Sequence, residues 1–234
     1  MDRYRTVAGA RTSRGPQKPR IEPVHANPSN GTVLKFAPSP APARHPPARS
    51  RNADRRPREH LTPAEVERLI ETAKKRGRYG QRDATAILLA YTHGLRVSEL
   101  AALNWSQIDF ANGVIHITRL KNGRPSTQPL RGVELRALRQ LRREWPESRF
   151  VFQNERGTPM TAAGFRKTLT RIGEASGFPW LVHPHQLRHA IGYKLANSGT
   201  DTRTLQHYLG HRSIEHTVRY SELASDRFAG LWHD

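Results

Sequence analysis

The distribution of proline divides this 234-residue chain into two parts with different capacities to fold. Ten of the 17 prolines lie before residue 58, in a stretch that is also rich in Arg, Ser and Ala and poor in large apolar residues. Such a stretch buries too little apolar surface to offset the entropy lost on folding. We therefore predict a disordered basic tail over residues 1–58 and one folded domain over residues 59–234.

Both parts of the chain are strongly basic. The formal net charge is +19, of which residues 1–58 contribute +10 and residues 59–234 contribute +9. Because the folded part is basic by itself, the charge indicates a polyanionic partner such as nucleic acid. The tail is either a solvated segment or an arm that follows DNA, and the sequence leaves both readings open.

Several classes of protein are disfavoured by what the sequence lacks. It contains no cysteine, which excludes disulfides and thiolate metal sites. It has no apolar run of about 18 residues, as a membrane span needs, and its first residues do not resemble a secretion signal. We expect a cytoplasmic protein without a membrane partner.

The folded part combines helical and strand patterns. Thr62-Pro63-Ala64-Glu65 is a capping box that predicts the start of a helix. Asn122-Gly123 predicts a hairpin turn between two strands. The expected class is mainly α with a small antiparallel β-sheet (α+β). The expected strands are 113–118, 126–130 and 150–152, and the expected helices after the first are about 82–92, 97–103, 133–144, 161–175, 184–198, 202–208, 213–220 and 224–231.

A set of basic side chains could together hold one phosphate group. Arginine binds two phosphate oxygens through its planar fork, and Glu99 follows Arg96 closely enough on a helical turn to orient it. His185 and Arg188 share a helical face, since they are three residues apart. Each feature alone is commonly a surface salt bridge or a polar helix start, so the inference depends on the whole set. The candidates are Arg96, Lys121 at the hairpin tip, His185, Arg188 and His211.

Tyr220 is the candidate nucleophile of this set. It follows His211 by nine residues, next to Arg219 in a polar stretch, as a mobile nucleophile would need. We expect the surrounding positive charge to ease its ionisation. A zinc site built from the neighbouring histidines is the alternative, but their spacing matches no familiar ligand arrangement, and the adjacent arginines favour an anion.

The order of these residues resembles the tyrosine recombinases, the phage-integrase family, and most closely the small fimbrial phase-variation recombinases. The resemblance covers about residues 60–233. It is carried by Arg119-Leu-Lys-Asn-Gly123, His183-Pro-His-Gln-Leu-Arg-His-Ala190, Tyr208-Leu-Gly-His-Arg212, His216-Thr-Val-Arg-Tyr220 and Arg227-Phe-Ala-Gly-Leu-Trp232. It implies the catalytic-domain fold of that family.

The resemblance also implies a mechanism. Tyr220 would attack a DNA phosphodiester and form a 3′-phosphotyrosyl intermediate, with no requirement for ATP or a metal. Arg96 and Arg188 would stabilise the developing charge, and Lys121 would protonate the leaving oxygen. His185 and His211 would hold phosphate oxygens or accept the tyrosine proton, and the sequence does not decide between them.

The implied partners are double-stranded DNA with specific recombination sites, three further copies of the chain in a tetramer, and accessory DNA-bending proteins. The expected location is the cytoplasm, with the nucleoid. Larger integrases carry a DNA-clamping domain before the catalytic one, and we expect none here. An apolar face of Phe228, Leu231 and Trp232 docks either on a neighbouring protomer or on the chain's own core. Two other functions stay open: a type IB topoisomerase-like enzyme, and a non-catalytic DNA-binding regulator.

Overall fold

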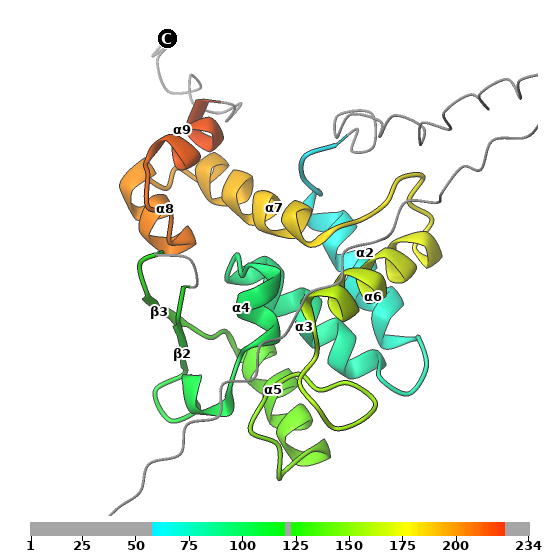
Figure 1. The fold of residues 1–234 in the computed structure, drawn as a ribbon. Coiled ribbons are helices and arrows are strands. Elements are labelled where there is room, and N and C mark those ends of the chain that lie inside the picture. The colour runs from blue at the N-terminus through cyan, green and yellow to red at the C-terminus, as the bar shows by residue number, and fades with distance from the viewer. Residues whose placement is uncertain (1–57, 120–122, 223–234) are drawn as a thin grey trace, which may run out of the picture. The chain divides into compact units, whose positions relative to one another are not determined.

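The computed structural model describes residues 58–119 and 123–222 of the chain (Figure 1). The predicted class is confirmed, because these residues form mostly helices and one three-stranded antiparallel sheet. The helices are α2 (Pro63–Lys74), α3 (Gly80–Thr92), α4 (Val97–Ala101), the 3-10 helix η1 (Trp105–Gln107), α5 (Gly132–Glu144), α6 (Ala162–Ala175), α7 (Pro184–Asn197), α8 (Thr202–Leu209) and α9 (Glu215–Glu222).

The first helix begins where its capping box predicts. The Thr62 hydroxyl accepts a hydrogen bond from the Glu65 amide at 3.3 Å, and a Glu65 carboxylate oxygen accepts one from the Thr62 amide at 2.8 Å. These two bonds satisfy amides that have no partner inside the helix. Pro63 fits the first turn, because its missing N–H would be unpaired there in any case.

The sheet consists of β1 (Ile108–Asp109), β2 (Val114–Ile117) and β3 (Ser126–Pro129). The predicted hairpin is confirmed: β2 and β3 pair antiparallel, with Ile115 opposite Gln128 and Ile117 opposite Ser126. Asn122, in the predicted turn, and the predicted helix 224–231 with its apolar face lie outside the described residues. The two-residue strand β1 has no pattern long enough to be read from sequence.

The strand expected at residues 150–152 was wrong. Phe150 makes only an isolated bridge with Asn104, and the next bridge pairs Gln153 with Pro159. Val151 and Phe152 are nevertheless buried, and their backbone bonds go to loops, with the Val151 amide donating to the Leu103 carbonyl at 2.9 Å. A short apolar run predicts burial, but burial alone does not specify a strand.

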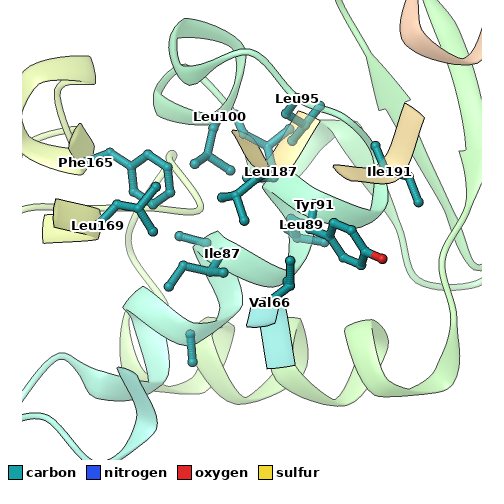
Figure 2. Close-up of a cluster of buried hydrophobic side chains, with 14 of the residues drawn as sticks. Val66, Ile87, Leu89, Tyr91, Leu95, Leu100, Phe165, Leu169, Leu187 and Ile191 are labelled. Carbon is teal, nitrogen blue, oxygen red and sulfur yellow. The ribbon is translucent and has the colours of Figure 1, made fainter. Parts of the chain in front are cut away.

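The core surrounds α3, which packs against α2, α5 and α7. Figure 2 shows Leu89 of α3 among side chains from several helices, including Leu100 of α4 and Leu187 of α7. Both of these leucines are fully buried, and each such side chain contributes roughly 1.5–3 kcal/mol of transfer free energy. Their packing fixes α4 and α7 against the same core. Within residues 58–119 and 123–222 we find no helical segment with the length and hydrophobicity of a transmembrane span.

Candidate active site

A pocket of about 370 Å³ lies where the N-termini of α4 and α7 meet. Arg96 caps α4, and His185 and Arg188 come from the first turns of α7. All three line the pocket together with Arg166 of α6. The fold therefore brings three of the predicted phosphate-binding side chains into one place, from segments about 90 residues apart.

The Arg96 side chain is held by Glu99, as the sequence predicts. One Glu99 oxygen accepts from Arg96 Nη1 at 2.8 Å, and the other accepts from the Arg96 backbone amide at 2.8 Å. The second oxygen also accepts from Nη1 of Arg119, a fully buried side chain, at 2.8 Å. Burial alone would raise the pKa of Glu99, but Arg119 and Arg96 outweigh it and the pKa lies below its usual value. Glu99 is therefore a buried carboxylate shared by two arginines.

Arg188 is fixed by backbone carbonyls. Its guanidinium donates to the Gly94 carbonyl, and Nη2 donates to the Leu209 carbonyl at 2.7 Å. Gly94 has φ 56° at the turn that ends α3, a conformation that favours glycine. Burial and the nearby Arg96 and Arg119 lower the pKa of Arg188 to about 9, so it stays charged at neutral pH. The side chain is thus oriented before any phosphate arrives.

Lys121 lies outside the described residues, and its place in the site stays a prediction. The nearest described residues before and after it, Arg119 and Gly123, lie close to Gly210, in the turn before His211. The Arg119 side chain passes so close to Gly210 that a Cβ there would lie 2.6 Å from Nε. A Cβ on Gly123 would lie 3.0 Å from the Gly210 carbonyl oxygen. The base of the hairpin is therefore next to the site.

His211 is buried beside the predicted nucleophile. Its Nδ1 lies 2.8 Å from the Thr217 hydroxyl, and its ring is nearly parallel to that of Tyr220, with centroids 6.3 Å apart. Burial, together with Arg188 and Arg96, lowers the pKa of His211 to about 3. His211 is therefore neutral here, so it can hydrogen-bond a phosphate oxygen but is a weak base.

Tyr220 differs from the sequence expectation. It is 1% exposed, and its ring packs against α7, where a Cβ on Gly192 would lie 2.8 Å from the phenol carbons. The hydroxyl lies 2.8 Å from Nδ1 of His189. Burial raises the pKa of Tyr220 although Arg188 and Arg219 act in the opposite direction. The expectation of eased ionisation is wrong for this structure, because the cost of burial exceeds the effect of the cations.

The sequence reasoning missed two residues that this geometry makes prominent, Arg119 and His189. His189 follows His185 by four residues, so both lie on one face of α7, with ring centroids 5.7 Å apart. Gly192, one turn further on, admits the Tyr220 ring to the same face. This i, i+4, i+7 spacing was the available signal. Within the described part of the chain, no three His, Asp or Glu side chains are close enough together to hold a metal ion.

Residues 59–227 match the model of the Phage integrase family. This chain belongs to that family. The type 1 fimbriae regulatory protein FimB of Escherichia coli K12 is 40% identical over 185 residues, which cover 77% of this chain and 92% of FimB. FimE of the same strain is 42% identical over 181 residues, or 75% of this chain and 91% of FimE. The predicted resemblance to fimbrial recombinases is confirmed.

The fold of this phage integrase family member also matches a solved recombinase structure. The Tn1549 transposon integrase in complex with a circular intermediate DNA superposes with a TM-score of 0.63 at 25% identity. The match covers 71% of this chain and 62% of the integrase chain. The tyrosine-recombinase catalytic fold, predicted from the sequence, is confirmed.

Proposed function

We propose that this chain is a site-specific DNA recombinase that cleaves and rejoins DNA strands through a 3′-phosphotyrosyl intermediate on Tyr220. One observation carries the proposal: Arg96, His185 and Arg188 line a single pocket, and Arg188 is close enough to the buried Tyr220 to interact with it electrostatically. A pocket walled by arginines and a histidine suits a phosphate group, because charge-assisted bonds to its oxygens are strong and bidentate.

The proposed reaction conserves the energy of the broken phosphodiester bond in a covalent phosphotyrosine intermediate. The Tyr220 oxygen forms a bond to phosphorus, and the bond from phosphorus to the 5′-oxygen breaks, so that the nucleophile keeps one strand end. The phenolic proton passes to a base, and the leaving 5′-oxygen takes a proton from an acid, for which Lys121 is the candidate. A second 5′-hydroxyl then attacks the phosphotyrosine, releases Tyr220 and restores the backbone.

The arginines act mainly on the transition state. Arg96 and Arg188 face the pocket in orientations fixed by Glu99 and by backbone carbonyls. Such preorganised donors stabilise charge that develops on the equatorial oxygens, and removing one commonly costs about 10²–10³ in rate. His185 and His211 serve as further donors to phosphate oxygens.

The partner is double-stranded DNA carrying a specific site. Complete exchange between two duplexes needs four cleavages, so we propose a tetramer on DNA, assisted by accessory DNA-bending proteins. The described domain alone is basic, which favours attraction to DNA at low salt. We place the reaction in the cytoplasm, on the nucleoid, and leave open whether its product is an inversion or an integrated element.

The test is covalent capture on a nicked duplex. DNA flanking the gene is searched for inverted repeats, and a duplex with such a repeat, nicked beside the cleavage position, traps the adduct because the short strand diffuses away. Wild-type protein should form the adduct, and Tyr220→Phe should form none while binding the duplex equally well. Tyr79→Phe, which changes a tyrosine that does not line this pocket, is the matched control and should react like wild type.

Three results would contradict the proposal. An adduct formed by Tyr220→Phe would mean that another residue is the nucleophile. Supercoil relaxation by monomers at any sequence would favour the topoisomerase-like function. Tight binding to the repeat without any adduct from the wild-type protein would favour a regulator.

A further inference from the structure

We propose that His189 is a positioning residue for the nucleophile: its Nδ1 accepts the hydroxyl hydrogen of Tyr220 and holds the phenol in a buried resting site. This inference rests on the proposed function, because it takes Tyr220 to be the nucleophile. It concerns a residue outside the set of six that the sequence indicates.

The contact is built by two helices. On α7, His189 and Gly192 are three residues apart and face the same side, where α9 brings Tyr220. The hydroxyl lies 2.8 Å from Nδ1, and the two ring centroids are 5.7 Å apart. Gly192 leaves room for the phenol, and the Tyr193 ring meets it edge-on at 5.0 Å. The phenol thus occupies a formed cavity whose polar end is His189.

The direction of the hydrogen bond follows from the protonation states. Burial raises the pKa of Tyr220, so the phenol keeps its proton. Burial, His185 and Arg219 lower the pKa of His189 to about 4, with Arg188 in the same direction and Glu59 opposed, so the imidazole is neutral. In the described part of the chain, the hydrogen bond recorded for this hydroxyl is the one with Nδ1 of His189. Because a buried hydroxyl hydrogen without an acceptor is costly, the proposal assigns Nδ1 as the acceptor, which places the imidazole hydrogen on Nε2.

The same facts argue against His189 as the base of the reaction. A group whose pKa is about 4 holds a proton poorly at neutral pH, and a phenol with a raised pKa releases one poorly. A neutral acceptor can still fix the direction of the C–O bond. Tyr220 is also not among the residues that line the proposed phosphate pocket, so the proposal implies that the phenol leaves this site, or that the site opens, before attack.

Residues on either side of Tyr220 in α9 also hold this helix in place. Nη2 of Arg219, next to Tyr220 on α9, donates to both carboxylate oxygens of Glu59, at 2.8 and 2.6 Å. The hydroxyls of Thr202 and Ser221 lie 2.8 Å apart. These contacts fix the backbone of α9, while His189 fixes the one atom of Tyr220 that reacts.

The first test reads the tautomer and needs no DNA. The full chain, labelled with ¹⁵N-histidine, is observed at neutral pH by long-range ¹H–¹⁵N spectra, with His189 assigned by His189→Asn. We expect the Nε2–H tautomer, and a shift of the Nδ1 resonance in Tyr220→Phe. His207, exposed on α8, is the matched control and should not respond. An Nδ1–H tautomer, or an unchanged Nδ1 signal in Tyr220→Phe, overturns the proposal.

The second test separates positioning from proton transfer, using the nicked duplex described above. Asparagine places an amide oxygen near the position of Nδ1, so it can accept a hydrogen bond but cannot carry the proton. We expect His189→Ala to form adduct roughly 10–100-fold more slowly, as a misplaced reacting group does, with DNA binding unchanged. His189→Asn should recover most of that loss, and His207→Ala should match wild type.

Equal loss in His189→Ala and a folded His189→Asn would make His189 a catalytic base and overturn the positioning role. An unchanged or faster His189→Ala would overturn it as well. If the wild-type protein forms no adduct, the proposed function fails, and the tautomer experiment alone then decides the resting contact.

Discussion

Replacing Glu99 by glutamine tests how far one buried carboxylate organises the site. Glu99 pairs with Arg96 and with Arg119, whose side chain is 0% exposed. Glutamine keeps the shape and can still accept from the Arg96 amide, but it removes the negative charge. The same amide oxygen can still accept from Nη1 of Arg119, but Arg119 would then be a buried cation with no paired carboxylate, and its other acceptors are the neutral carbonyls of His93, at 3.4 Å, and Tyr208, at 2.6 Å.

The magnitude follows from the burial of the two arginines. Removing one partner of a buried ion pair costs about 3–5 kcal/mol. The Arg96 side chain is 28% exposed, so its half of the interaction adds less than about 1 kcal/mol. For a domain of this size each kcal/mol shifts Tm by about 2–4 °C, so Glu99→Gln should lower Tm by about 6–20 °C. DNA cleavage should fall too, because Arg96 loses the group that orients it.

The assay is thermal and urea unfolding followed by circular dichroism. Glu147→Gln, at an exposed position, is the control and should change the free energy of unfolding by less than about 0.5 kcal/mol. The double variant Glu99→Gln/Arg119→Met should regain part of the loss, since it removes the buried cation that Glu99→Gln leaves without a carboxylate. A loss below about 1 kcal/mol for Glu99→Gln alone would refute the reasoning.

Gly192→Ala puts a Cβ 2.8 Å from the Tyr220 ring, and this overlap should lower the free energy of unfolding, measured in urea, by about 1–3 kcal/mol. The higher helix propensity of alanine should offset roughly 1 kcal/mol of that loss. In a Tyr220→Ala background Gly192→Ala should stabilise instead, and no reversal would contradict the close contact. The lowered pKa values of His211 (about 3) and His189 (about 4) mean that below about pH 6.5 the unfolded chain binds protons the folded chain does not. The free energy of unfolding should therefore fall from pH 7 to pH 4, by up to about 1.4 kcal/mol for each pH unit and for each of the two histidines. A free energy of unfolding that does not change over this pH range would exclude buried neutral imidazoles. Arg166→Ala should weaken duplex binding at all sequences and reduce the salt slope in fluorescence anisotropy by about 1; an unchanged slope would mean that Arg166 contacts no phosphate.

Local patterns in the sequence predicted the elements well. The capping box at Thr62 and the hairpin signal at Asn122-Gly123 act through neighbours a few residues away, so no tertiary information is needed to read them. The same holds for Glu99, whose distance of three residues from Arg96 sets their pairing. Family resemblance then supplied what local patterns could not, namely that distant segments meet.

Burial and long-range partners could not be predicted in this way. Arg119 directly follows the expected strand 113–118, and nothing local predicts that its guanidinium lies against the carbonyl of Tyr208, 89 residues away. The polar neighbours of Tyr220 along the chain suggested a mobile side chain, whereas its ring is buried against α7. The apolar run at 150–152 is buried in a loop because its backbone bonds reach other loops. In each case the deciding contact depends on the packing of whole helices.

The excess of positive charge in the site explains why its arginine side chains need fixed hydrogen-bond acceptors. Arg96, Arg119 and Arg188 lie close enough to lower the pKa of Arg188, and Glu99 is the carboxylate that pairs with the first two. Two units of positive charge therefore remain in a partly buried cluster, where like charges repel strongly. Backbone carbonyls and the Glu99 carboxylate accept hydrogen bonds from these arginines and orient them. One carboxylate cannot neutralise three cations. Because this arrangement is least favourable when the pocket lacks an anion, the phosphodiester that we propose as its ligand would relieve the repulsion at the place where charge would develop during cleavage. The separate buried site of Tyr220 is consistent with the proposed function, since the cations would then be fixed before the proposed nucleophile moves.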